Sequence, residues 1–203
     1  MTAPTLHRET FATSRAAEFF ELRALQAQTG QPARRFAEVL VKELVDNALD
    51  AAETAGASPE ITIELARAGD LLAITVSDNG PGMPPELLER VLDFSVLVSD
   101  KAAYRSPTRG LQGNALKTIV GIPHALGSAV PVVVEALGVR HAIAAAIDPA
   151  GELRISHQQT ETSRLAGTAF TVTIPIEDQR FDGARWSRAF ALVNPHAAVT
   201  YRR

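Results

Sequence analysis

Residues 36–51 read FAEVLVKELVDNALDA and contain the strongest helical signal in the chain. Glu43, Asn47 and Asp50 follow one another four and three residues apart, so they would share one polar stripe of that helix. The apolar residues recur with the same helical period, and the face expected to pack into a core consists of Val39, Leu40, Leu44, Ala48 and Leu49. A stripe of this kind is usually solvated surface, and only motifs further along the chain favour a functional site.

The composition limits the classes of protein to consider. A chain of 203 residues suits one domain with a buried core, alone or with an appendage. It contains no cysteine, which excludes a disulfide scaffold, and its net charge of −3 gives no bulk attraction to nucleic acid. The N-terminal residues lack an apolar signal segment, and the longest apolar stretch, residues 129–146, is interrupted by charged residues. We therefore expect a cytoplasmic chain without a membrane segment.

Helices are expected early in the chain and strands mainly late. The expected helices span residues 14–27, 32–55, 84–92, 181–192 and a stretch that ends near 126 after a glycine turn at 110–117. The expected strands span residues 61–65, 71–77, 130–137, 140–147, 153–159, 168–175 and 197–201. Four successive strands without intervening helices argue against a doubly wound parallel sheet. The chain is therefore predicted to be an α+β sandwich, with helices over one face of a mixed, largely antiparallel sheet.

Residues 78–83, DNGPGM, follow the second strand of an expected β-hairpin. They place a carboxylate at a strand end, and their two glycines let the backbone approach a flat ligand closely. Taken alone, the motif is more often a simple tight turn, because Asp, Asn, Gly and Pro all favour turns. Gly167-Thr168, before a late strand, is equally weak by itself, since threonine is common in strands.

Residues 110–117, GLQGNALK, have the character of a phosphate-binding loop. Bare backbone amides at a helix N-terminus favour anions, and Lys117 would add a positive charge. The pattern differs from the P-loop, because the sequence GxxxxGK[ST] is absent. A glycine-capped loop without a ligand remains the alternative. The segment between residues 93 and 109 has no clear period and is long for a connection, which favours a functional loop or lid.

The order of these four motifs is more specific than any one of them. Together they resemble the GHKL superfamily of ATPases, which includes type II topoisomerase ATPase subunits, heat-shock chaperones, mismatch-repair ATPases, MORC proteins and histidine kinases. The resemblance runs from about residue 14 to the end of the chain. It implies the Bergerat type of helix-over-sheet sandwich, with ATP held between the helices and the sheet.

The resemblance also implies separate roles for the residues of the first helix. Glu43 would polarise the attacking water, and Asn47 would ligate the Mg²⁺ ion that bridges the triphosphate oxygens. Histidine kinases typically lack a carboxylate at the position of Glu43, so its presence favours hydrolysis over phosphate transfer. The alternatives are a histidine or anti-sigma type of protein kinase, a MORC-like ATPase and a module that senses ATP without turnover.

The remaining binding residues are also carried over from the resemblance. Asp78 would accept a hydrogen bond from the adenine amino group, and Lys101 would approach the phosphates from the lid. The further residues implied to contact the nucleotide are Gly82, Met83, Gly110, Leu111, Gln112, Gly113, Asn114, Ala115, Leu116, Lys117 and Thr168.

A narrower resemblance is to the ATPase subunits of type IIB DNA topoisomerases, the topoisomerase VI B-subunit family. It rests on residues 14–20, 101–113 and 193–197, whereas residues 114–117, NALK, look closer to the MORC pattern. The resemblance implies an ATP-dependent homodimer that acts on DNA with a DNA-cleaving partner subunit. Residues 1–30 would form a strap exchanged between the two copies, and residues 31–203 the ATP-binding domain. Hydrolysis is expected to be slow, because that family uses a lysine from a further domain.

Overall fold

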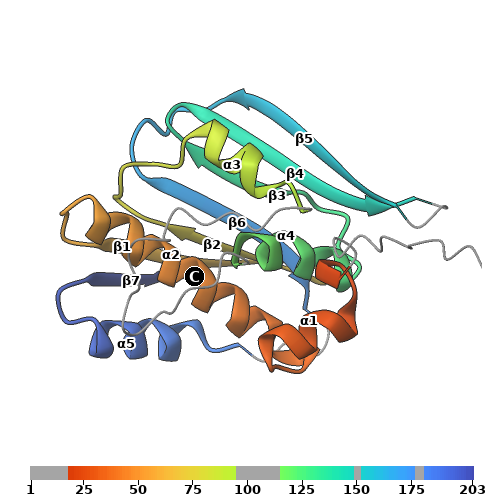
Figure 1. The fold of residues 1–203 in the computed structure, drawn as a ribbon. Coiled ribbons are helices and arrows are strands. Elements are labelled where there is room, and N and C mark those ends of the chain that lie inside the picture. The colour runs from red at the N-terminus through yellow and green to blue at the C-terminus, as the bar shows by residue number, and fades with distance from the viewer. Residues whose placement is uncertain (1–17, 95–114, 149–151, 177–180) are drawn as a thin grey trace, which may run out of the picture.

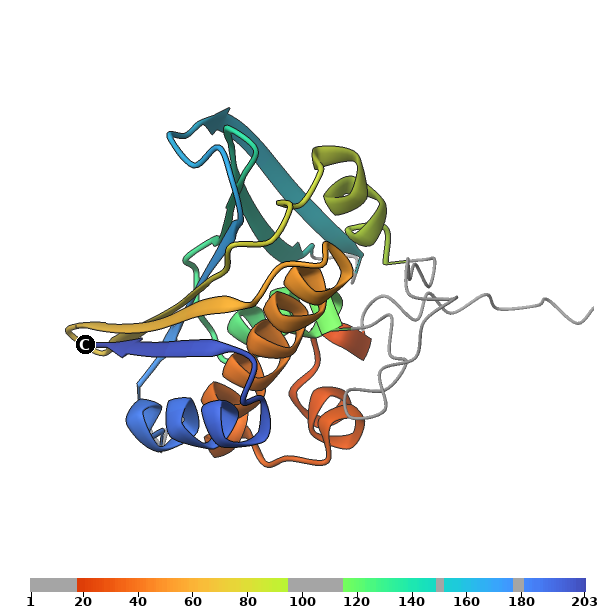
Figure 2. The ribbon, with the colours of Figure 1, turned by 90° about the vertical axis from the view of Figure 1, so that its left-hand side faces the viewer.

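A seven-stranded sheet with helices on one side forms the frame of the structure (Figure 1, Figure 2). The computed structural model describes residues 18–94, 115–148, 152–176 and 181–203. The elements are α1 Leu22–Thr29, the 3₁₀ turn η2 Ala33–Arg35, α2 Phe36–Thr54, β1 Glu60–Ala68, β2 Leu71–Ser77, α3 Pro85–Val91, α4 Ala115–Ala125, β3 Val132–Ala136, β4 Val139–Ile147, β5 Leu153–Glu161, β6 Thr168–Pro175, α5 Gly183–Val193 and β7 Ala198–Arg202.

The sheet is mixed but mostly antiparallel. Its strand order is β5-β4-β3-β6-β2-β1-β7, and only the β1–β7 pair runs parallel. This arrangement confirms the expected α+β class and the helix-over-sheet layers. Among the described helices, none is long and apolar enough to cross a membrane.

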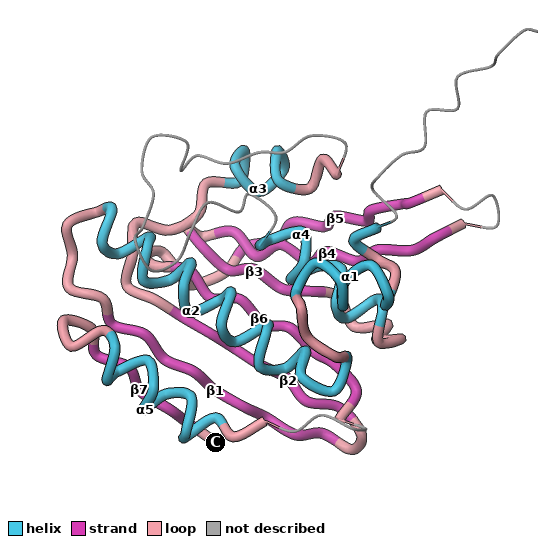
Figure 3. Tube along the Cα trace, turned by 60° about the horizontal axis from the view of Figure 1, so that its bottom comes forward, coloured by secondary structure: helices cyan, strands magenta, loops and turns pink. Residues whose placement is uncertain are grey.

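Helix α2 forms the centre of the core. Figure 3 shows it lying across β2 and β6, while α5 lies along the β7 edge. The apolar face expected from the sequence is buried, with Leu40 and Leu49 fully enclosed against strand residues such as Ile63 and Ile74. Burial of each such side chain stabilises the fold by about 1.5–3 kcal/mol. The helix therefore holds its polar stripe in a fixed place above the sheet.

The predicted helix at residues 14–27 is confirmed from residue 22 onward, where α1 runs, but not at residues 18–21. Phe19 and Phe20 are 7% and 3% exposed, and α1 begins only at Leu22. Residues 18–20 instead form a short 3₁₀ turn, which is separated from α1 by Glu21 and buries both rings. The helix ends at Thr29, two residues later than expected at Ala27, and its C-cap Gly30 adopts the left-handed conformation.

Phe19, Phe20 and Phe94 form an aromatic cluster against α4. The ring of Phe94 lies 5.8 Å from that of Phe19 and 4.9 Å from that of Phe20. Gly121 of α4 permits this contact, because a Cβ atom there would overlap the carbonyl oxygen of Phe19. The residues before α1 are therefore packed directly on α4 and on the end of the segment that follows α3.

This contact predicts the effect of a single methyl group. We expect Gly121→Ala to lower the free energy of unfolding by about 2 kcal/mol, because the surrounding backbone must move. Gly69→Ala is the control, since Gly69 has a φ of 56° but open space around it. It should cost only about 1 kcal/mol. Urea denaturation measures both values, and an equal or smaller loss for Gly121→Ala would contradict the close packing.

Candidate functional site

The polar stripe of α2 carries an amide in an unusual state. The Nδ2 atom of Asn47 is buried and has no hydrogen-bond partner among the described residues. A buried polar group without a partner costs about 1–3 kcal/mol. Rotation of the amide exchanges its nitrogen and oxygen, so the same position can present either a donor or an acceptor. An acceptor atom of a ligand would satisfy Nδ2 as it stands, whereas a cation would be bound only with the amide oxygen at this position.

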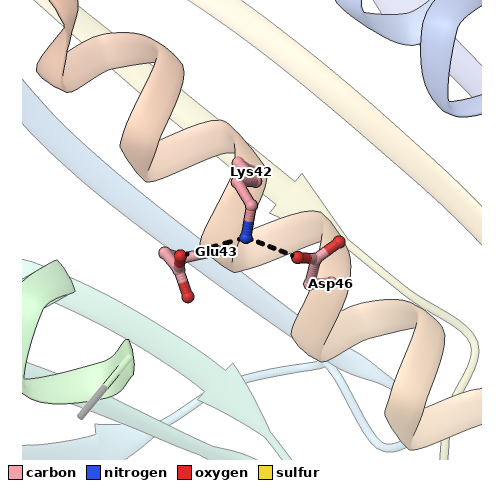
Figure 4. Close-up of polar contacts among 3 residues, drawn as sticks. All are labelled: Lys42, Glu43 and Asp46. Atoms are coloured by element: carbon pink, nitrogen blue, oxygen red, sulfur yellow. Dashed lines mark hydrogen bonds and ion pairs between the residues drawn. The ribbon is translucent and has the colours of Figure 1, made fainter. Parts of the chain in front are cut away.

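Glu43 lies one turn before Asn47 and takes part in an exposed ion pair (Figure 4). The Nζ atom of Lys42 lies 3.2 Å from Oε1 of Glu43 and 2.9 Å from Oδ2 of Asp46. Burial opposes the charged form of Lys42, but the hydrogen bond with Asp46 and the two carboxylate charges outweigh it and raise the pKa of the lysine. The Lys42 side chain is 50% exposed, so the pair is worth no more than about 1 kcal/mol, and Glu43 can leave it easily.

Asp78 occupies the end of β2 and is held by backbone amides from two loops. Its Oδ1 atom accepts hydrogen bonds from the N–H of Gly80 at 2.8 Å and of Thr168 at 3.1 Å. Within the described residues, nothing donates to its other oxygen, Oδ2. Burial raises the pKa of Asp78, although the two amide hydrogen bonds and the charge of Arg164 oppose the rise. The carboxylate is thus fixed in place with one oxygen available to a donor.

Gly80 and Gly167, which were not among the residues predicted to contact the nucleotide, allow this junction to form. A Cβ atom on Gly167 would overlap the carbonyl oxygen of Asp78, and Gly167 has a φ of 66°. Its N–H donates to the Gly80 carbonyl at 3.1 Å, while the Asp78 N–H donates to the Thr168 carbonyl at 2.9 Å. The only sequence signal for Gly167 was its place before Thr168.

The Asp78 turn also touches the polar stripe of α2. A Cβ atom added to Gly80 would lie 3.2 Å from the Cβ of Ala51. Glu43, Asn47 and Ala51 are spaced four residues apart and therefore share one stripe of the helix. The structure thus joins two motifs that are well separated in the sequence, with Asn47 between Glu43 and the Asp78 turn.

Lys117 lies in the first turn of α4 and is buried beside two aromatic rings. It is 1% exposed, and its ammonium group lies 5.7 Å and 5.6 Å from the ring centres of Phe19 and Phe94. Burial lowers the pKa of Lys117, opposed by the charge of Asp93. The structure therefore places this lysine within the aromatic cluster, and its contact with a phosphate stays a prediction.

The other predicted site residues are distributed as follows. Met83 is partly buried against the core, and Thr168 is 5% exposed at the start of β6. Ala115 and Leu116 form the first turn of α4. Asp50, which was given no chemistry, is 9% exposed on α2. The predicted residues that lie outside the described part of the chain are Lys101, Gly110, Leu111, Gln112, Gly113 and Asn114.

The donor set also indicates how a metal would be held. Among the described residues, no three acidic or histidine side chains converge on one point. Mg²⁺ prefers oxygen ligands and retains several waters, and it is often bound by few protein groups together with substrate phosphates. Asn47 fits that pattern as a single protein ligand beside a bound polyphosphate.

Comparison with known proteins identifies the family of the chain. Residues 33–178 match the family model described as histidine kinase-, DNA gyrase B- and HSP90-like ATPase. The matched range includes α2, the Asp78 turn and the Gly167-Thr168 junction.

Individual relatives point to one branch of that family. The chain is 32% identical to the B subunit of type 2 DNA topoisomerase 6 from Natronomonas pharaonis, over 91% of this chain and 24% of that protein. It is 29% identical to the protein of the same name from Methanosarcina barkeri, over 91% of this chain and 31% of that protein. The chain thus spans less than a third of the length of either relative. It belongs to the GHKL family of ATPases and is related to the B subunits of topoisomerase VI.

Proposed function

We propose that this domain binds ATP with Mg²⁺ and hydrolyses it slowly. The observation that carries the proposal is the continuous stripe on α2, where Glu43 and the unpartnered amide of Asn47 lead to Ala51 and the Asp78 turn. A nucleotide could extend along this line, with its base at Asp78 and its phosphates above Asn47. The match of residues 33–178 to an ATPase family model supports ATP as the ligand.

Each residue then has one task. The free oxygen of Asp78 accepts a hydrogen bond from the adenine amino group. Asn47 ligates Mg²⁺, which neutralises phosphate charge when it is bound. Glu43 leaves its weak pair with Lys42 and accepts the proton of the water that attacks the terminal phosphorus, and ADP departs as the bond to its oxygen breaks. Gly82, Met83 and Thr168 contact the adenine base. The phosphates are approached by Lys101 and residues 110–117.

The wider function is also proposed by analogy. The relatives are named as subunits of a type 2 DNA topoisomerase. We propose that this domain likewise forms an ATP-dependent homodimer in the cytoplasm and acts on DNA with a DNA-cleaving partner subunit. Residues 1–30 would be exchanged between the two copies, and residues 31–203 would form the ATP-binding domain.

Replacement of the proposed base should separate binding from turnover. We expect Glu43→Gln to keep ATP affinity within about twofold, since the residue does not hold the nucleotide, and to lower hydrolysis by about 10²–10⁴-fold. Calorimetry and phosphate release measure the two effects. Glu38→Gln, on the same helix but paired with Arg35 at 3.3 Å, is the control and should behave as the parent. Unchanged turnover in Glu43→Gln would assign the chemistry elsewhere, and no turnover in the parent would indicate an ATP sensor.

Replacement of Asp78 should affect binding and stability in opposite directions. We expect Asp78→Asn to weaken ATP binding about 10–100-fold, because a charged acceptor is lost. The folded state raises the pKa of Asp78 above its value of 3.8, so it binds this proton more tightly than the unfolded chain does. The contribution of Asp78 to stability is therefore largest below pH 3.8, and it falls as the pH rises from there through the raised pKa of the folded state. Asn keeps an oxygen for the Gly80 and Thr168 amides without the charge.

Stability against pH checks the second half of this prediction. Asp78→Asn should match the parent at low pH and exceed it at neutral pH, as measured by thermal unfolding at a series of pH values. A variant that binds ATP as the parent does would show that Asp78 is not at the base. A stability difference that did not change with pH would contradict the burial of the charge.

Nucleotide should also change the oligomeric state. We expect the mass measured by light scattering to double when a non-hydrolysable ATP analogue and Mg²⁺ are added. Asp78→Asn, which should bind the analogue poorly, is the control and should remain monomeric. A parent protein that stayed monomeric with the analogue demonstrably bound would exclude ATP-driven dimerisation.

A further inference from the structure

The turn between β3 and β4 contains a strained leucine. Leu137 has a φ of 50° and is the one non-glycine residue with a positive φ among those described. It is followed by Gly138 with a φ of 81°, and Ala136 pairs with Val139, so the hairpin turn has two residues. Turns of this kind need a positive φ at both positions, and they favour Asn-Gly or Gly-Gly. A leucine at the first position is unfavourable for the backbone.

The surrounding structure holds this turn in place. The N–H of Gly138 donates to the carbonyl of Arg164 at 2.7 Å, and the N–H of Thr162 donates to the carbonyl of Gly138 at 3.0 Å. The hydroxyl of Thr162 donates to Glu135 at 2.7 Å on the preceding strand. Backbone strain that is maintained by its surroundings is concentrated at functional sites, so the leucine side chain needs an explanation.

The Leu137 side chain lies against the glycine-rich turn that follows Asp78. A Cβ atom on Gly82 would be 2.8 Å from Cδ2 of Leu137, 2.9 Å from its Cγ and 3.4 Å from the carbonyl oxygen of Gly167. Gly82 itself has a φ of 85°. The leucine and Gly82 therefore meet next to Gly167, whose own Cβ position would overlap the backbone carbonyl oxygen of Asp78.

Leu137 is nevertheless not a core residue. It remains 41% exposed, whereas the leucines of the core are almost fully enclosed. Packing alone would therefore favour a residue that suits the turn, such as Asn or Gly, at this position. An apolar side chain that is partly open beside a bare glycine backbone instead has the character of the wall of a ligand site.

We propose that Leu137 forms an apolar wall of the base site, and that its isobutyl group packs against the purine ring whose amino group binds Asp78. This inference rests on the proposed function and names a contact that the motifs do not contain. The leucine supplies apolar surface to a flat aromatic ring and offers no hydrogen-bond partner to a polar substituent at that edge. In this proposal, leucine is retained at a position of positive φ, where it is unfavourable, because its side chain contacts the ligand.

Two substitutions separate the wall from the strain. Leu137→Asn removes the apolar group and suits the turn, so we expect ATP affinity to fall about fivefold and the melting temperature to rise by about 2 °C. Leu137→Ala removes the same contact but keeps the unfavourable φ, so we expect a similar loss of affinity without the rise. Leu137→Met retains an apolar side chain and should bind ATP within about twofold of the parent.

Calorimetry with ATP and Mg²⁺ and thermal unfolding without ligand are the two measurements. Leu192→Asn is the matched control, because Leu192 is 81% exposed on α5 and it should leave ATP affinity unchanged. The proposal is overturned if the Leu137→Asn variant binds ATP as the parent does. It is also overturned if this variant melts below the parent, because the leucine would then serve packing. The proposed function itself is tested separately, by ATP binding to the unmodified protein, and it is refuted if that protein binds no ATP.

Discussion

The carboxylate of Asp78, held by two backbone amides, is the interaction on which the site depends. Strand β2 ends at Ser77 opposite Ala169 of β6, so the chain leaves one strand where the other begins. The amides of Gly80 and Thr168 do not continue the strand pairing on that side, and Asp78 accepts from both. Only glycine allows the backbones to approach this closely at residue 167. One side chain therefore ties the turn after β2 to the start of β6.

Several locally unfavourable features gather around this junction. Asp78 is a charge in a partly buried position, Asn47 has a buried amide atom without a partner among the described residues, and Leu137 has a strained backbone. Each would be removed by selection for stability alone. The cost is offset by the core, where α2 buries its apolar face on the sheet. Helix α2 thus stabilises the core with its apolar face, and its polar stripe belongs to the group of unfavourable features around Asp78.

Sequence reasoning succeeded where the signal was local and periodic. The apolar face of α2 and the hairpin of β1 and β2 follow from residue spacing, and each was predicted within a few residues. The break at Phe20 was not visible, because only the folded core shows that two adjacent rings are both buried. The parallel pairing of β7 with β1 joins strands far apart in sequence, and no local pattern specifies it. Leu137 was missed for the same reason, since its contact with Gly82 exists only after β3, β4 and β2 assemble.

The surroundings of Lys117 could not be predicted from its residue type and its place after a glycine loop. A lysine after a glycine loop suggests a phosphate contact, yet its ammonium is enclosed between Phe19 and Phe94. Desolvation of a charge is unfavourable, and the faces of two aromatic rings and the charge of Asp93 compensate for it in part. Phe19 precedes α1 and Phe94 follows α3, so this lysine connects both segments to α4.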